Sequence, residues 1–129
     1  MNVFVYGTLL CGESNHHVAQ PYLISVQIGG VRGVLYDVGE YPALMLDAEA
    51  NIVAGEWLAL DPSALPVLDE LEDYNGPEGP NEYERVWVRD ESGPALEGWI
   101  YVYNDARGLP VISDGSWRDY CRSRNAKIT

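Results

Sequence analysis

Apolar and polar residues alternate in short runs along most of the chain, and turn-forming residues separate these runs. This period of two predicts seven strands. They are Asn2–Tyr6, Leu23–Ile28, Val31–Val38, Leu44–Asp47, Ile52–Leu60, Tyr83–Arg89 and Leu96–Asn104. The connections between them, such as Gly29-Gly30 and Ser92-Gly93-Pro94, are of hairpin length. Short strands joined by tight turns predict a mainly antiparallel sheet that closes or nearly closes.

One segment has helical periodicity instead. Asp61-Pro62 offers an N-cap followed by a proline at the first helical position, and the pattern continues to about Asp73. The polar segment Asn75–Asn81 ends this helix in a loop. Short helical turns are also expected at Val18–Tyr22 and near Trp117.

The charge of the chain excludes several classes of partner. Among 129 residues, 20 are acidic and 8 are lysine or arginine, which gives a net charge of −12. Such a field repels nucleic acid and anionic membranes, so neither is expected as a partner. Four of the basic residues lie near the C-terminus and are expected to form a solvated tail: Arg118, Arg122, Arg124 and Lys127.

Targeting and metal-binding signals are not evident in the sequence. No apolar run approaches the roughly 20 residues of a membrane span, and no signal peptide is visible, so a cytoplasmic protein is expected. Cys11 and Cys121 lie far apart and are expected to be reduced thiols. His16 and His17 are adjacent and point in different directions, which is poor geometry for a metal site.

The predicted helix carries a cluster of acids in the sequence VLDELEDY, Val67 to Tyr74. At about 100° per residue, its leucines form an apolar stripe, and Glu72 lies only about 40° from the centre of that stripe. The stripe is formed by Leu65, Leu68 and Leu71. The other acids lie about 100° to 160° away and are expected to be solvated: Asp69, Glu70 and Asp73. Glu72 therefore faces the core side of its helix.

A carboxylate on the buried side of a helix loses hydration, which raises its pKa and requires a partner or a role. Arg85, in the sequence YERVWVR, offers an ion pair with Glu72. A general acid and base in a cleft is the other interpretation. Helix geometry leaves both open.

The first strand ends in VFVYGTLL, Val3 to Leu10, where glycine interrupts the apolar run. One interpretation is an ordinary turn at the exit of the strand. The other is a loop whose backbone amides approach an anionic ligand, with Gly7 allowing an unusual φ and a close approach. The octapeptide alone supports both.

Two of these segments carry a resemblance to a known family. VYGTLL, and LDELEDY followed by YERVWV, resemble the γ-glutamylcyclotransferase-like (AIG2-like) proteins. Further segments match in the same order and extend the resemblance over nearly the whole chain: SNHH (14–17), LYDVGEYPAL (35–44), VAGEWLAL (53–60) and GSWRDY (115–120). The resemblance implies an α+β fold, a small mixed, mainly antiparallel β-barrel with a few short helices, in a single domain spanning residues 1–129.

The resemblance also implies an activity. Active members cleave the amide on the γ-carbonyl of a γ-glutamyl group and release 5-oxoproline and a free amine, without a metal or another cofactor. By this resemblance Glu72 is the catalytic residue, and the substrate-binding residues are Tyr6, Gly7, Thr8, Leu9 and Tyr103.

Some features leave the function open. Leu10-Cys11 and Asp73 depart from the family pattern beside the site, and these departures bear on the choice of substrate. A barrel that binds a small ligand without turnover, or acts as an interaction module, is the alternative function. The small γ-glutamyl substrate is the expected partner. The leaving amine, the oligomeric state and a role of the Asn75–Asn81 loop as a lid do not follow from the sequence.

Overall fold

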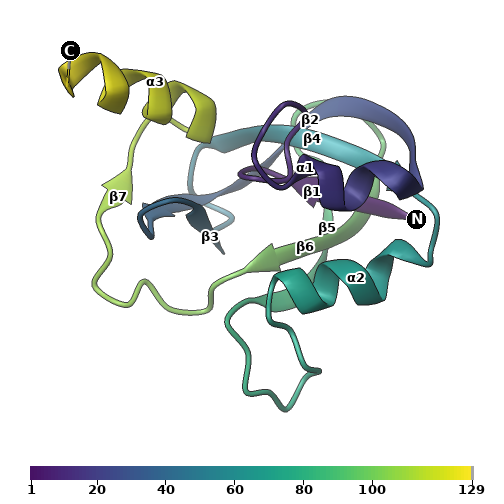
Figure 1. The fold of residues 1–129 in the computed structure, drawn as a ribbon. Coiled ribbons are helices and arrows are strands. Elements are labelled where there is room, and N and C mark those ends of the chain that lie inside the picture. Colours follow the sequence, from purple (N-terminus) through teal and green to yellow (C-terminus); the bar gives the residue numbers. More distant parts are fainter. Residues whose placement is uncertain (129) are drawn as a thin grey trace.

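The computed structural model describes residues 1–128, in which seven strands form one curled sheet with helices around it (Figure 1). The strands are β1 (Asn2–Val5), β2 (Leu23–Asp37), β3 (Pro42–Leu46), β4 (Ile52–Leu60), β5 (Glu84–Arg89), β6 (Glu97–Val102) and β7 (Val111–Ile112). The helices are α1 (His16–Ala19), a 3-10 turn (Gln20–Tyr22), α2 (Ala64–Leu71) and α3 (Trp117–Ile128). The predicted α+β class is confirmed.

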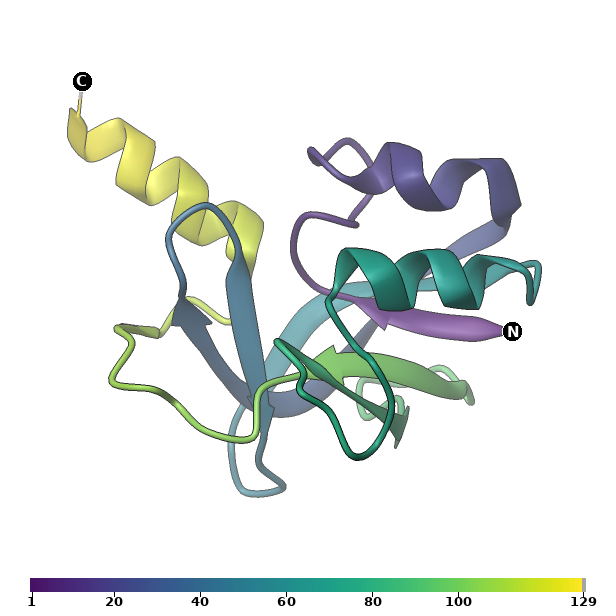
Figure 2. The same cartoon turned by 60° about the horizontal axis from the view of Figure 1, so that its bottom comes forward.

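The sheet has the strand order β3-β2-β4-β1-β6-β5, with β7 paired to β2. Only β1 and β6 are parallel among the described strand pairs. Beyond the end of β6, the Tyr103 amide donates a hydrogen bond of 2.9 Å to the Leu44 carbonyl of β3. The two ends of the sheet therefore approach each other, and the strands curl into a half-barrel (Figure 2). This confirms the prediction of a mainly antiparallel sheet that nearly closes.

The prediction of a hairpin turn at Gly29-Gly30 is wrong. Both glycines lie inside β2, which runs without a break over 15 residues and pairs with β4. A Cβ on Gly29 would lie 2.4 Å from the Trp57 ring, and one on Gly30 would lie 2.5 Å from Ile52. The absence of a side chain at these glycines therefore lets Trp57 and Ile52 pack directly against the backbone of β2. The sequence pattern does not distinguish this role from a turn.

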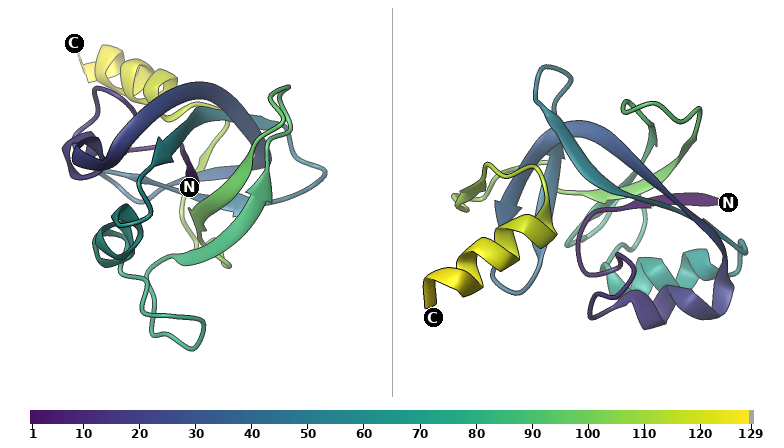
Figure 3. Two further views of the ribbon diagram at one scale, coloured as in Figure 1. Left: turned by 90° about the vertical axis from the view of Figure 1, so that its right-hand side faces the viewer. Right: turned by 90° about the horizontal axis from the view of Figure 1, so that it is seen from above.

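Strand β1 is buried on both faces. Val3 and Val5 join a core cluster with residues of α1 and α2, whereas Phe4 packs in a second cluster with Trp57 and Trp117. In Figure 3, α1 and α2 lie together on one side of the sheet, and α3 lies apart from them. The end of β1 consequently emerges in the middle of the molecule, beside the C-terminal end of α2.

The helices differ from the prediction at their ends. Helix α2 begins at Ala64, because the Asp61 carboxylate closes a turn by accepting hydrogen bonds from the amide and hydroxyl of Ser63, at 2.9 and 2.6 Å. It ends at Leu71, so Glu72 is its C-cap residue. The helical turns expected at Val18–Tyr22 are confirmed. None of the helices in residues 1–128 is long and apolar enough to cross a membrane.

The C-terminal segment is a regular helix rather than a short turn, and part of its basic cluster is packed. Arg124 donates to the Gly39 carbonyl at 3.0 Å and lies 5.4 Å from the centre of the Trp117 ring. Arg118 is also engaged, as described below, so a solvated tail is the wrong description for both residues. Arg122 is exposed, as expected, and the side chain of Lys127 lies outside what the structure describes.

Candidate active site

A pocket of about 200 Å³ lies between the end of β1 and the end of α2. It brings together five of the six residues that the sequence singled out: Tyr6, Gly7, Thr8, Leu9 and Glu72. The sixth, Tyr103, does not line this pocket; it contacts residues that do.

Glu72 enters the pocket from the C-terminal end of α2. Burial, and then the negative charge of Glu82, raise the pKa of Glu72 to about 7. Its carboxyl group makes no hydrogen bond to any residue within 1–128. A carboxyl group with these properties changes its protonation state near neutral pH and has both oxygens available to a ligand.

The structure rules out one of the two interpretations of Glu72, the ion pair with Arg85. Arg85 forms its ion pair with Asp69, and the Tyr101 hydroxyl donates to the same carboxylate at 2.7 Å. An Arg85–Glu72 ion pair is therefore excluded. The expectation that Asp69 is solvated is also wrong. Arg85 of β5 and Tyr101 of β6 pack against the side of α2 that bears Asp69. The position of Asp69 around the helix axis does not reveal these neighbours.

The loop after β1 has its carbonyls held by hydrogen bonds. The Gly7 carbonyl accepts from the Leu10 amide at 3.1 Å, and the Thr8 carbonyl accepts from the Asn15 amide at 2.8 Å. His16 Nδ1 lies 2.9 Å from the Leu9 carbonyl and donates to it. Within residues 1–128, by contrast, the amides of Gly7, Thr8 and Leu9 donate to no acceptor. Successive backbone amides without an acceptor can bind an anion without a basic side chain.

Gly7 is required for a reason other than the expected one. Its φ lies outside the left-handed region, so the expectation of an unusual φ is wrong. A Cβ at this position would lie 2.7 Å from both Cγ and Cδ of Pro42. Glycine is therefore needed for the close approach of the loop to Pro42, which lines the same pocket.

Two buried tyrosines around the pocket are neutral, and their hydroxyls form hydrogen bonds with backbone groups. Tyr6 donates to the Tyr101 carbonyl at 2.6 Å and accepts from the Leu44 amide at 3.2 Å. Tyr83 donates to the Pro42 carbonyl at 2.7 Å. Burial raises the pKa of both phenols. These hydroxyls join the ends of β1, β3 and β6 and hold the shape of the pocket.

Glu82 also lines the pocket, although the sequence analysis did not single it out. Tyr103 donates a hydrogen bond to its carboxylate, and the Tyr41 hydroxyl does so at 3.4 Å. Glu82 lies in the irregular segment before β5, where no helical or strand period predicts whether a side chain points inward or outward. Its position next to Tyr83, at the start of the predicted strand, is the one signal that the sequence offered.

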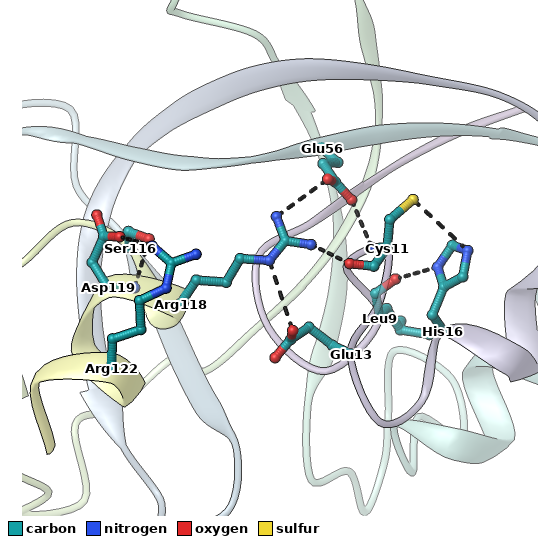
Figure 4. Close-up of polar contacts among 9 residues, drawn as sticks. All are labelled: Leu9, Cys11, Glu13, His16, Glu56, Ser116, Arg118, Asp119 and Arg122. Atoms are coloured by element: carbon teal, nitrogen blue, oxygen red, sulfur yellow. Dashed lines mark hydrogen bonds and ion pairs between the residues drawn. The ribbon is translucent and has the colours of Figure 1, made fainter. Parts of the chain in front are cut away.

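The loop is attached to distant parts of the chain through Cys11 (Figure 4). The Cys11 amide donates to Glu56 of β4 at 2.8 Å, and Arg118 of α3 donates to the Cys11 carbonyl. Arg118 also forms ion pairs with Glu56, at 3.4 Å, and with Glu13, at 3.7 Å. Helix α3 thus contributes to the position of the loop that carries the free amides.

Both cysteines are free, as predicted. The Cys11 sulfur lies 3.8 Å from His16 Nε2, and burial and Glu56 raise the pKa of this thiol. In the part of the chain that is described, no three His, Cys, Asp or Glu residues come together as metal ligands.

Comparison with known proteins gives a consistent result. The model of the family described as gamma-glutamyl cyclotransferase, AIG2-like, matches residues 3–119. A gamma-L-glutamyl-butirosin B gamma-glutamyl cyclotransferase from Niallia circulans is 42% identical, over 92% of this chain and 76% of its own. The gamma-glutamylcyclotransferase family protein YtfP of Escherichia coli K12 is 32% identical, over 92% of this chain and 97% of its own. The structure of an AIG2-like protein from Mus musculus superposes with a TM-score of 0.69 at 25% identity, over 86% and 84% of the two chains.

Proposed function

Because the chain belongs to the AIG2-like gamma-glutamyl cyclotransferase family, we propose that it cleaves a γ-glutamyl amine or peptide into 5-oxoproline and a free amine. The observation that carries this proposal is the position of Glu72. This carboxyl group, with a pKa of about 7, shares one pocket with the free amides of Gly7, Thr8 and Leu9. The pocket therefore combines a proton-transfer group with a site for the substrate's α-carboxylate.

The amides orient the substrate. When they hold its α-carboxylate, the neighbouring α-ammonium lies within the same pocket as Glu72. The nucleophile and the γ-carbonyl belong to one molecule, so closing the five-membered ring has little entropic cost. Effective molarities for well-oriented groups are on the order of 10⁵ M or more. The remaining requirement is transfer of a proton.

Glu72 performs this transfer in successive steps. As a carboxylate it accepts a proton from the α-ammonium, and the free amine then attacks the γ-carbonyl carbon to form the new C–N bond. As a carboxylic acid it gives this proton to the departing nitrogen while the original amide C–N bond breaks. The carboxylate so regenerated takes the second proton from the ring nitrogen and passes it to the released amine, which leaves as an ammonium ion. Neither water nor a redox partner is consumed. One carboxyl group serves these steps when its pKa is close to the working pH.

The leaving amine is proposed to extend out of the pocket. The relative from Niallia circulans is named as a gamma-glutamyl cyclotransferase of gamma-L-glutamyl-butirosin B, so its name places the γ-glutamyl group on butirosin B. The pocket described here has an open rim, formed by Glu82 and the exposed Tyr41. A γ-glutamyl group occupying the pocket would project its leaving amine through this rim.

A direct test is to incubate the protein with a panel of γ-glutamyl amines and peptides and to follow 5-oxoproline by mass spectrometry. We expect release from at least one member of the panel and none with Glu72→Gln, while that variant still binds the same ligand by calorimetry. Binding without release by the wild-type protein would favour the non-catalytic alternative.

A further inference from the structure

We propose that Glu82 determines specificity by binding a positively charged group on the leaving amine, so that the preferred substrates are γ-glutamyl conjugates of amines that carry a second, cationic nitrogen. This inference rests on the proposed function and concerns the other end of the same pocket. It is argued from the charges in the pocket, the contacts of Glu82 and the direction in which the pocket opens.

The pocket is acidic on its side chains. Within residues 1–128 its lining includes two carboxyl groups, Glu72 and Glu82, and no lysine or arginine. The free backbone amides of the loop provide for the α-carboxylate of the substrate. Glu72 is assigned to proton transfer, which leaves the negative charge of Glu82 without a complement in the γ-glutamyl part of the substrate.

The contacts of Glu82 stabilise its charge and leave room for a ligand. Tyr103 and Tyr41 both donate to its Oε1 atom. Its Oε2 atom lies 3.4 Å from Arg107, which also donates to the Glu82 carbonyl at 2.9 Å and lies over the Tyr103 ring. The Glu82 and Arg107 side chains are 34% and 42% exposed, and ion pairs with such exposure contribute little. A carboxylate accepts about four hydrogen bonds. An ammonium group can therefore bind to Oε2, beside the ring of Tyr41, which offers a cation–π contact.

The direction of the pocket assigns Glu82 to the leaving amine. Tyr6, Gly7 and Leu9 are buried, whereas Tyr41 and Leu71, which line the same pocket, are each 37% exposed. A substrate with its α-carboxylate at the buried loop points its leaving amine toward the exposed rim, which includes Glu82 and Tyr41. The net charge of −12 adds to this preference, because it attracts cationic ligands over a distance.

The decisive experiment compares two substrates of equal length. N-(γ-glutamyl)-1,4-diaminobutane ends in an ammonium group, and N-(γ-glutamyl)-pentylamine ends in a methyl group at the same place. At low salt we expect kcat/KM for the cationic substrate to exceed that for the neutral one by about tenfold or more. We expect added NaCl to reduce this ratio, because salt screens the interaction at the exposed rim.

The Glu82→Gln variant tests the residue itself. We expect it to lower the ratio of kcat/KM for the two substrates several-fold toward one. A change in folding or in proton transfer by Glu72 alters kcat/KM for both substrates by the same factor. The ratio of the two kcat/KM values within one variant is therefore unaffected by such a change. The matched control is Glu78→Gln, which removes the same charge from an exposed loop position that does not line the pocket. It should leave the ratio nearly unchanged.

Two results would overturn the inference. One is a wild-type ratio near or below one. The other is an equal loss for both substrates in Glu82→Gln, which would assign Glu82 to the glutamyl ammonium or to Glu72 alone.

A binding measurement separates this inference from the proposed function. Calorimetry with the Glu72→Gln variant reports affinity for the same two ligands without turnover. Preference for the cationic ligand without 5-oxoproline release by the wild-type protein would refute the cyclotransferase activity and support the role of Glu82. Release of 5-oxoproline with no preference in either measurement would support the cyclotransferase activity and refute the role of Glu82.

Discussion

The carboxyl groups of Glu72 and Glu82 line the same pocket, and the charge of Glu82 adds to burial in raising the pKa of Glu72 to about 7. Their surroundings differ. Glu82 accepts hydrogen bonds from two tyrosine hydroxyls, whereas Glu72 accepts none within residues 1–128. Two carboxyl groups in one pocket are thereby suited to two tasks, one to carry a proton and the other to hold a charge.

The pH dependence of the reaction should report the pKa of Glu72. The carboxylate form starts the proposed reaction, so kcat/KM should rise with pH and level off above about pH 7. Glu82→Gln removes a negative charge that raises this pKa, and the rising limb should therefore move to lower pH. The measurement is the rate of 5-oxoproline release from about pH 5 to about pH 9. An unchanged limb in the variant would contradict this electrostatic link.

Glu72→Gln should make the fold more stable at alkaline pH. Because the folded pKa of about 7 lies above the reference value of 4.5, the folded state binds more protons between these values, and stability falls as pH rises through this range. The glutamine avoids that loss. We expect a gain on the order of 1–3 kcal/mol at about pH 8 and little difference at about pH 4, by urea unfolding.

The matched control for this stability effect is Glu70→Gln on the same helix. Glu70 is exposed, so its replacement should change stability little at either pH. A Glu72→Gln protein that is less stable than wild type at about pH 8 would show that Glu72 is held by favourable contacts instead.

Arg118→Gln should weaken substrate binding from outside the pocket. It removes the hydrogen bond from α3 to the Cys11 carbonyl and the ion pair with Glu56, whose side chain is 11% exposed. The loop after β1, which carries the free amides, then loses these contacts with the rest of the fold. We expect KM to rise several-fold with kcat largely retained, and the free energy of unfolding to fall by about 1–3 kcal/mol.

The conservative variant Arg118→Lys should restore part of the binding, since it keeps the charge beside Glu56. Arg122→Gln is the control, because Arg122 is 77% exposed and pairs only with Asp119 among the described residues (Figure 4). A loss of stability in Arg118→Gln without any change in KM would mean that the contact has a structural role alone.

Gly7→Ala should destabilise the fold as well as the site. The added Cβ would collide with the Pro42 ring at 2.7 Å, and overpacking of this kind costs about 1–3 kcal/mol. Pro42→Ala removes the two ring atoms concerned, so the double variant should recover much of the loss in thermal unfolding. Additive losses in the double variant would show that the contact with Pro42 is not the cause.

Local periodicity predicted much of the fold. Strand β4 has the predicted bounds, and β1, β5 and β6 differ from prediction by one or two residues at their ends. The two-residue strand β7 was missed, because so short a segment has no period to detect. The long strand β2 was divided in error, because a glycine pair gives the same signal for a turn as for a close crossing of side chains.

The sequence by itself determined most of the strands, the position of α2 and the inward side of Glu72, because these follow from repeats within one segment. Contacts between distant segments decided the rest. The partner of Arg85 is 16 residues away in sequence, and Arg118 reaches Cys11 across 107 residues. Asn15 and His16 donate to carbonyls of the loop, whereas the Gly7, Thr8 and Leu9 amides find no acceptor within residues 1–128. No local pattern encodes such pairings, since they arise only when the curled sheet brings the segments together.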